Sequence, residues 1–169
     1  MINNLIVLLG PTGVGKTNIS VDLASRLNCE IISADSRQFF REMKTGTAVP
    51  SDQQLLTIRH HFIGFMSVET YYSSSLYERD VLNLLQELFL VNNRVLMTGG
   101  SGMYIDAVCQ GIDDIPDVDR KIRDKYTAMY RESGIEGLRA ALKLFDPEHY
   151  SKVDLKNYKR IIRALEICE

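Results

Sequence analysis

Cysteine is scarce in this sequence of 169 residues, and neither charge sign is in large excess. The three cysteines, Cys29, Cys109 and Cys168, are an odd number, lie far apart and include no Cys-x-x-Cys pair. This disfavours a disulfide framework and a zinc site, and a reducing cytosol fits best. Lysine and arginine total 20 against 22 aspartate and glutamate, so the net charge of -2 does not mark the whole chain as a nucleic-acid binder.

Long apolar runs are also missing near the start of the chain. The strongest one there, at 5–9, is far too short to span a membrane, and no basic segment precedes it. We therefore predict a cytoplasmic protein without a membrane segment, in which residues 5–9 form a buried strand.

A glycine-rich motif follows this strand and fits the P-loop pattern Gly-x-x-x-x-Gly-Lys-Thr. Its residues are Gly10, Pro11, Thr12, Gly13, Val14, Gly15, Lys16 and Thr17. Such a loop surrounds an anion with backbone N–H groups at the start of a helix, with the lysine on the terminal phosphate and the threonine hydroxyl on Mg²⁺. We predict that residues 10–17 bind a diphosphate or triphosphate and that Thr17 is a Mg²⁺ contact.

Apolar runs bounded by glycines then alternate with segments of helical period. This order is typical of strand, helix and parallel strand, and it predicts an α/β fold: a P-loop NTPase-like parallel sheet flanked by helices, with a helical insertion. Strands are predicted at 5–9, 30–33 and 94–97, with a weaker candidate at 61–64. Helices are predicted at 16–27, at 103–108, and from a capping-box sequence at 75–78 to about residue 89.

The alternation stops after Gly111, where the acidic, proline-containing stretch 112–117 predicts a linker. Helices are predicted beyond it, at 118–132, at 135–145 and from about 157. The predicted domains are a P-loop catalytic core at 1–112, a helical insertion at 113–150 and a return to the core at 151–169. Because the last helix reaches the terminus without a stop signal, we expect the chain to be cut within this element.

An ATP or GTP enzyme is the default expectation for a P-loop. A kinase would need a metal-holding carboxylate after a later apolar strand, but the strand at 94–97 is followed by the sequence Thr-Gly-Gly-Ser-Gly at 98–102. The acidic residue that we expect to lie nearest the P-loop is instead Asp35. It follows the strand at 30–33 together with Ser36, Arg37 and Gln38. Ligands of open α/β sheets bind at the carboxyl ends of the strands, so we predict that this polar cluster belongs to the site.

Six segments together resemble the tRNA dimethylallyltransferase family: GPTGVGKT at 10–17, ISADSRQ at 32–38, GTA at 46–48, HHFIG at 60–64, TGGSGMYIDAV at 98–108 and KRIIRALEI at 159–167. They occur in the family's order and extend over nearly the whole chain. Three residues depart from the family's common pattern: Ser101 replaces threonine, Phe40 replaces tyrosine and Val49 replaces lysine. The last two place minor substrate contacts in doubt. Family members are nearly twice as long, so the resemblance implies a C-terminally truncated chain that is inactive alone.

The resemblance implies transfer of a dimethylallyl group from dimethylallyl diphosphate to the exocyclic N6 amine of the adenine 3′ of the tRNA anticodon. Lys16, Thr17 and Mg²⁺ would then stabilise the leaving diphosphate. Asp35 would accept the proton of the attacking amine as general base. Ser101 would hold the adenine or the base. A strand-end cap or an indirect Mg²⁺ ligand remains open for Asp35, and a turn cap remains open for Ser101.

The target adenine must leave its stack, which requires positive charge beside the pocket. The segment 120–131 contains five basic residues and one acidic residue, and the segment 152–163 contains the same numbers. Such runs are usually solvated helix faces, but the resemblance favours contact with the anticodon stem. The predicted tRNA-binding residues are Asp35, Ser36, Arg37, Gln38, Ser101, Arg123, Lys159, Arg160 and Arg163.

Three other functions remain open: an adenylate isopentenyltransferase acting on a free nucleotide, a P-loop kinase of nucleotides or small molecules, and a tRNA-binding fragment without activity. The insertion helices favour tRNA over a free nucleotide. His60 and His61 are neighbours and would point to opposite faces of a strand, so we predict structural roles for both. A monomer is the simplest expectation.

Overall fold

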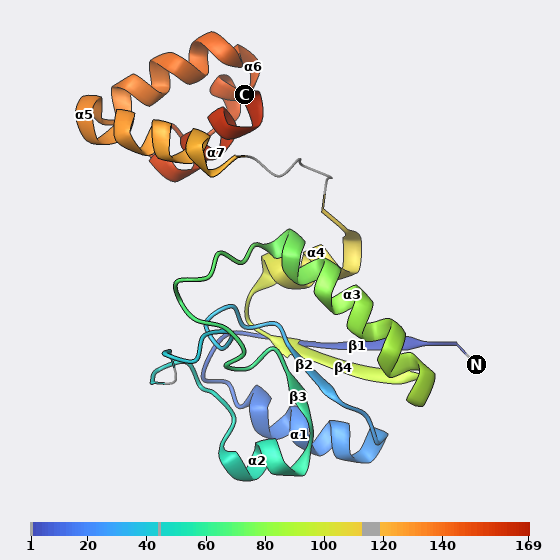
Figure 1. Ribbon diagram of the computed structural model, residues 1–169. Coiled ribbons are helices and arrows are strands. Elements are labelled where there is room, and N and C mark those ends of the chain that lie inside the picture. Colours follow the sequence, from blue (N-terminus) through green and yellow to red (C-terminus); the bar gives the residue numbers. More distant parts are fainter. Residues whose placement is uncertain (1, 44, 113–118) are drawn as a thin grey trace. The chain divides into compact units, whose positions relative to one another are not determined.

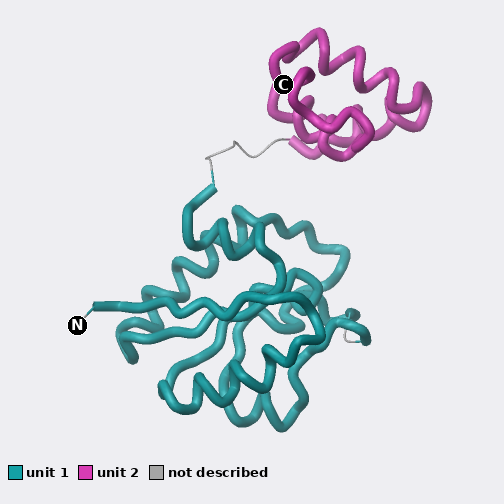
Figure 2. The backbone as a smooth tube through the Cα atoms, turned by 180° about the vertical axis from the view of Figure 1, so that it is seen from behind, with its two compact units in different colours: residues 1–112 teal, residues 113–169 magenta. Residues whose placement is uncertain are grey.

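The computed structural model describes residues 2–43, 45–112 and 119–169. The chain forms two compact units, 1–112 and 113–169 (Figure 2). The domain boundary predicted after residue 112 coincides with the boundary between the units. Residues 113–117 of the predicted linker lie outside the described residues.

Unit 1 contains a sheet of four parallel strands in the order β1-β4-β2-β3. The strands are β1 (Asn4–Leu9), β2 (Ile31–Ser33), β3 (His60–His61) and β4 (Arg94–Gly99). In the register of the sheet, Ile31 lies opposite both Leu96 and His60. The predicted parallel α/β sheet is confirmed.

Helices cover both faces of this sheet (Figure 1). Helix α1 (Lys16–Leu27) lies on one face, and helices α3 (Ser74–Val91) and α4 (Gly102–Gln110) lie on the other. Neighbouring residues of β2 separate accordingly, because successive side chains of a strand point to opposite faces. Ile31 packs in the cluster that contains Ala24 of α1, whereas Ile32 packs in the larger cluster with residues of α3 and α4.

Aromatic rings fill the side of the sheet covered by α3 and α4. Phe39 is 1% exposed and lies at the centre of this group. Its ring stacks on Tyr77 at a centroid distance of 5.2 Å, and four further rings meet it edge-on: Phe62, Phe65, Tyr72 and Tyr104. The buried Tyr77 hydroxyl donates to Ser33 O at 2.9 Å, which joins α3 to the end of β2.

Two predicted element boundaries are wrong. The strand predicted at 61–64 is β3 at His60–His61, because Phe62 and Gly64 adopt positive φ angles of 63° and 56° that leave the strand conformation. The capping box predicted from Ser75 does not begin α3. Ser73 caps this helix by accepting a hydrogen bond from Leu76 N–H at 3.2 Å.

A short helix that the sequence did not predict follows the loop after β2. Helix α2 (Asp52–Thr57) begins with a capping box in which Ser51 and Gln54 each accept a hydrogen bond from the other's backbone N–H. The Gln54 amide also donates to Asn18 Oδ1 of α1 at 2.7 Å. This contact ties α2 to the helix that follows the P-loop.

Unit 2 consists of helices α5 (Arg120–Phe145), α6 (Pro147–Lys152) and α7 (Tyr158–Cys168). Gly134, with φ 67° and ψ -164°, interrupts α5 and confirms the predicted division into two helices. Helix α7 shares one apolar core with α5, in which Leu138, Leu142 and Ile161 are fully buried. The structure therefore differs from the predicted division after residue 150, since 151–169 packs in the same unit as α5.

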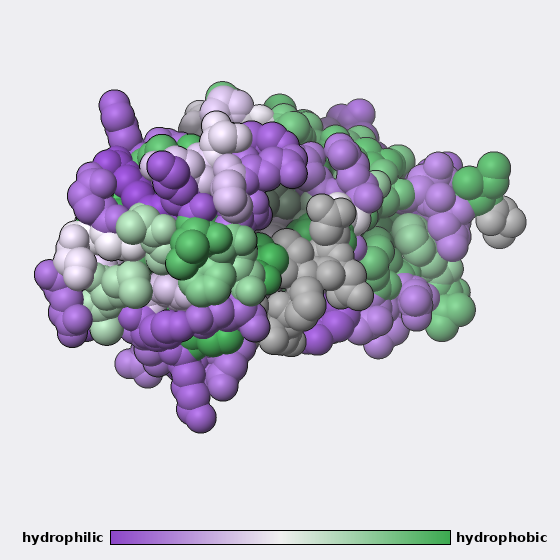
Figure 3. All heavy atoms as spheres, turned by 90° about the horizontal axis from the view of Figure 1, so that it is seen from above, coloured by the Kyte–Doolittle hydropathy of each residue, from purple (hydrophilic) through white to green (hydrophobic). Residues whose placement is uncertain are grey.

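The surface carries both polar and apolar side chains. On the face seen in Figure 3, green hydrophobic residues lie between purple hydrophilic ones. Exposed apolar side chains of unit 2 include Leu144, Phe145 and Ile167. In the part of the chain that the structure describes, no helix combines the length and the apolar character needed to cross a membrane.

Candidate functional site

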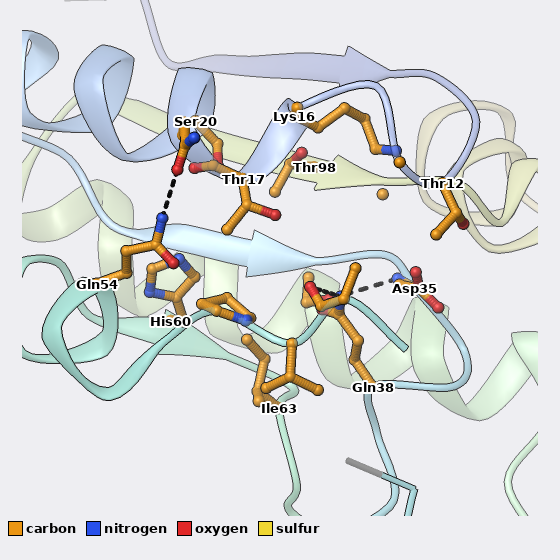
Figure 4. Close-up of a pocket in the computed structure, with 18 residues that line it drawn as sticks. Thr12, Lys16, Thr17, Ser20, Asp35, Gln38, Gln54, His60, Ile63 and Thr98 are labelled. Carbon is orange, nitrogen blue, oxygen red and sulfur yellow. Dashed lines mark hydrogen bonds between the residues drawn. The ribbon is translucent and has the colours of Figure 1, made fainter. Parts of the chain in front are cut away.

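A pocket of about 340 Å³ opens at the carboxyl edge of the sheet. The P-loop, the ends of β2 and β4, the loop at 46–50 and helix α2 all contribute to its lining. Figure 4 shows Lys16 and Thr17 across this pocket from Asp35, Gln38 and Ile63. The structure thus brings the P-loop together with Asp35 and Gln38, two of the four residues of the polar cluster after β2.

Five of the eight P-loop residues line the pocket: Thr12, Gly13, Gly15, Lys16 and Thr17. Gly10, Pro11 and Val14 belong to the same loop but are not among the lining residues. The Lys16 ammonium donates to Pro11 O at 2.6 Å, across the loop.

The start of α1 leaves backbone donors available to an anion. Gly15 precedes the helix with φ 88°, a conformation that favours glycine, and within the described residues no side chain caps this end. The first N–H groups of a helix lack intrahelical partners, and together with the helix dipole they attract negative charge. The backbone N–H groups and the lysine are therefore suited to hold a phosphate group.

The oxygen atoms around the pocket suit Mg²⁺ only in combination with a phosphate ligand. The Thr17 hydroxyl and the Asp35 carboxylate line the same pocket, and both are hard oxygen donors. Among the residues that the structure describes, no cluster of three or more His, Cys, Asp or Glu side chains could hold a metal. Mg²⁺ commonly takes one or two protein oxygens plus substrate phosphates, so the residues present fit it.

Asp35 both lines the pocket and closes a turn. Its Oδ1 accepts a hydrogen bond from Arg37 N–H at 3.1 Å, which is the capping role left open by the sequence. The other oxygen, Oδ2, has no hydrogen-bond partner among the described residues. Ser36 and Arg37 are not among the residues that line the pocket, and the Arg37 side chain is exposed.

Ser101 connects the two loops that follow β2 and β4. Its hydroxyl accepts from Ser36 N–H at 3.0 Å and donates to Ser36 Oγ at 3.2 Å, while its own N–H donates to Ala34 O. Within the described structure its side chain does not cap α4. Gly99 explains the close approach of these loops, because a Cβ there would lie 2.2 Å from Ala34 O.

Residues that the sequence assigned no substrate role also line the pocket, among them Gln54, His60 and Ile63. His60 Nδ1 lies 2.8 Å from Ile58 O, and its buried Nε2 has no hydrogen-bond partner within the described residues. Burial lowers the pKa of His60 below the ordinary value of 6.5. The HHFIG segment was a usable signal for His60, but adjacency with His61 favoured a structural interpretation. His61 Nε2 instead meets Glu30 Oε2 at 2.5 Å.

The carboxyl end of β4 brings Thr98 and Gly99 to the pocket. Neither can supply the metal carboxylate that a kinase needs there. A comparison with protein families gives the decisive finding, because the model of the IPP transferase family matches residues 38–169. The chain belongs to the IPP transferase family.

Individual proteins of the IPP transferase family match nearly the whole chain, including the P-loop that the family model does not cover. A tRNA dimethylallyltransferase of Porphyromonas gingivalis is 55% identical over 166 residues, which cover 98% of this chain and 55% of the relative. A tRNA dimethylallyltransferase of Bacteroides fragilis is 52% identical over 164 residues, 97% of this chain and 54% of the relative. The chain therefore spans about half the length of the curated relatives it matches.

Solved structures of the family share the fold. The tRNA isopentenylpyrophosphate transferase of Bacillus halodurans superposes with a TM-score of 0.63 at 34% identity, over 98% of this chain and 55% of that one. A eukaryotic dimethylallyltransferase acting on tRNA superposes with a TM-score of 0.80 at 24% identity, over 99% of this chain and 41% of that one. The second likeness is one of fold alone.

In the helical unit of this family chain, two of the predicted tRNA-binding arginines share one carboxylate. The Glu166 side chain is only 1% exposed, and both Arg123 and Arg163 pair with it, each with a 3.0 Å contact to Oε2. Burial alone would raise the pKa of Glu166, but the hydrogen bonds and charges of the two arginines outweigh burial and hold that pKa below 4.5. These arginines therefore stabilise the packing of α7 on α5.

Lys159 and Arg160 differ from this pair. Both side chains are exposed on α7, and neither has a side-chain partner among the described residues. They are consequently available to an external anion, and the predicted tRNA contact of these two residues stays a prediction.

Proposed function

We propose that this chain carries the diphosphate-binding and proton-accepting half of a tRNA dimethylallyltransferase. The enzyme would transfer a dimethylallyl group from dimethylallyl diphosphate to N6 of the adenine 3′ of the tRNA anticodon. The observation that carries this proposal is the composition of the pocket, where Lys16 and Thr17 lie across from Asp35 and Ile63 (Figure 4). The apolar side chain of Val49 also belongs to the lining. Membership of the IPP transferase family supports the same reaction class.

At the donor end, the bond between C1 of the allylic group and the diphosphate oxygen breaks, and the oxygen keeps the electron pair. The Lys16 ammonium and the N–H groups at the start of α1 bind the negative charge that grows on the leaving group. Thr17 would hold Mg²⁺, which neutralises part of the diphosphate charge when bound. Val49 and Ile63 offer an apolar surface to the alkyl group.

At the acceptor end, a new bond forms between N6 and C1, and N6 must lose a proton. Asp35 would accept it, and two features support this role: its Oδ2 is without a partner among the described residues, and its Oδ1 is held by Arg37 N–H. Ser101 would act through Ser36, by holding the loop after β2 against the loop after β4. Asp35 as an indirect Mg²⁺ ligand remains the alternative role.

Unit 2 is proposed to contact the anticodon stem and loop of tRNA. The exposed Lys159 and Arg160 carry the proposal, because phosphate contacts need cations that are not already paired. Arg123 and Arg163 are already paired with Glu166, which neutralises part of their charge, so they would contribute less to this surface. We further propose a cytoplasmic location, where the exposed thiols of Cys109 and Cys168 stay reduced, and a monomer as the simplest oligomeric state.

The test measures transfer of a labelled dimethylallyl group to unmodified tRNA. Wild type, Asp35→Ala and Asp35→Asn are compared at the equivalent position in the Porphyromonas gingivalis relative over its whole length, because this chain spans 55% of that relative and is expected to be inactive alone. We expect both substitutions to reduce turnover by about 100-fold or more with diphosphate binding retained, because general bases contribute about 10²–10⁴. Wild-type turnover in both variants would remove Asp35 from the reaction.

Two other acceptors separate the competing functions. Prenylation of free AMP with no transfer to tRNA would identify an adenylate isopentenyltransferase. Consumption of ATP with a phosphorylated product and no prenyl transfer would identify a kinase.

A further inference from the structure

The side-chain amide of Gln38 joins two segments of unit 1. Its Oε1 accepts a hydrogen bond from Ser33 Oγ at 2.9 Å, and its Nε2 donates to Thr47 O at 3.0 Å and to Ala48 O at 3.1 Å. Two carbonyl partners require two N–H donors, which fixes the orientation of the amide. Both amide protons are therefore already used inside the protein.

The segment at 46–50 forms one wall of the pocket and has no helix or strand of its own. Ala48, Val49 and Pro50 from this segment line the pocket. Ala48 has φ 49°, a left-handed conformation that a residue other than glycine holds only when its surroundings determine it. The carbonyl of this strained residue is one of the two that Gln38 binds.

We propose that Gln38 is a positioning residue, whose amide holds the wall at 46–50 against the end of β2 and thereby shapes the space for the alkyl group of the diphosphate substrate. This role replaces the direct adenine contact predicted from the sequence. A glutamine that reads adenine uses Nε2–H and Oε1 together, and here both N–H groups are committed to Thr47 and Ala48.

The identity of the alkyl group rests on the proposed function, whereas the anchoring of the loop does not. Two probes separate these levels. Inorganic pyrophosphate tests the P-loop alone, and dimethylallyl thiodiphosphate, an unreactive analogue, tests the P-loop together with the wall. Amide hydrogen exchange of peptides covering 45–57 tests the loop without any ligand.

The variant is Gln38→Met, which keeps a similar volume and removes all three hydrogen bonds. We expect pyrophosphate affinity to stay within about twofold of wild type, affinity for the analogue to fall about tenfold, and exchange at 45–50 to become faster. Gln53→Met is the matched control, because Gln53 is exposed on α2 and its side chain has no partner within the described residues. This control should change none of the three measurements.

Unchanged exchange at 45–50 together with an unchanged ratio of the two affinities would overturn the proposal. If Gln38→Met fails to fold, Ser33→Ala decides, since it removes only the bond to Oε1 and should shift both readouts in the same direction by a smaller factor; no shift in Ser33→Ala would contradict the anchoring. Should wild type bind the analogue no more tightly than pyrophosphate, the proposed function fails, and hydrogen exchange in Gln38→Met still decides the anchoring role.

Discussion

The two units of this chain use polar side chains in opposite ways. In unit 1, the amide of Gln38 and the hydroxyl of Ser101 bond to loops and so arrange an open pocket. In unit 2, the buried carboxylate of Glu166 forms ion pairs with two arginines where α7 packs on α5. These bonds of Gln38 and Ser101 arrange loops around the pocket, whereas the bonds of Glu166 hold two helices together. Substitutions should therefore affect the two units separately.

The largest expected effect concerns Phe39, which is 1% exposed and contacts five aromatic rings. Phe39→Ala should lower the free energy of unfolding of unit 1 by about 3–5 kcal/mol, because it leaves a cavity among these rings. Hydrogen exchange as a function of denaturant, followed separately for peptides of each unit, measures this change. Protection in α5 and α7 should stay as in wild type.

Phe145→Ala is the matched control for this prediction. Phe145 lies at the end of α5 and is 51% exposed, so its loss should change the free energy of unfolding by about 0.5 kcal/mol or less. A loss of protection in both units of Phe39→Ala would contradict the idea that the aromatic cluster stabilises unit 1 specifically.

Local patterns in the sequence predicted most of the fold because helical period and glycine-bounded apolar runs are local signals. Helix α1 was predicted at its observed ends, Lys16 and Leu27. Helix α2 was missed because its six residues are too short to show a period. The start of α3 was misplaced because Ser73, Ser74 and Ser75 stand in a row, and each is a suitable cap.

In the candidate site too, features carried by a continuous segment were predictable from the sequence, and contacts between distant residues were not. The P-loop was predictable because its pattern of residues lies in one continuous segment. The bond between Ser36 and Ser101 joins residues 65 apart, and the pairs of Glu166 and Arg123 join residues 43 apart. Such contacts depend on tertiary packing, which is why Arg123 was predicted as a tRNA contact without its carboxylate partner.

A smaller effect is expected from Glu166→Gln, which keeps the shape of the side chain and removes its charge. The two arginines are 40–44% exposed and keep part of their hydration, so we expect unit 2 to lose about 1–2 kcal/mol of unfolding free energy. Exchange in α7 peptides measures the loss. Glu136→Gln is the control, because Glu136 is 76% exposed and its pair with Arg139 should contribute about 0–1 kcal/mol. Equal losses of unfolding free energy in the two variants would contradict the idea that the buried Glu166 stabilises unit 2 more than an exposed ion pair does.

The smallest expected effect is a difference in acid sensitivity between the units. Arg123 and Arg163 hold the pKa of Glu166 below 4.5, so the stability it contributes is fully present above pH 4.5 and is lost as pH falls through the lowered pKa. Burial lowers the pKa of His60 below 6.5, so the unfolded state takes up a proton on this ring more readily than the folded state does. Unit 1 therefore loses stability as pH falls below 6.5. Between pH 6.5 and 5, the amide protection factors, which correct for the pH dependence of intrinsic exchange, should therefore fall around His60 before they fall in α7. The Glu166→Gln variant should approach wild-type stability in unit 2 as pH falls below 4.5, and a constant gap between the two at all pH values would show that Glu166 acts through shape and not through charge.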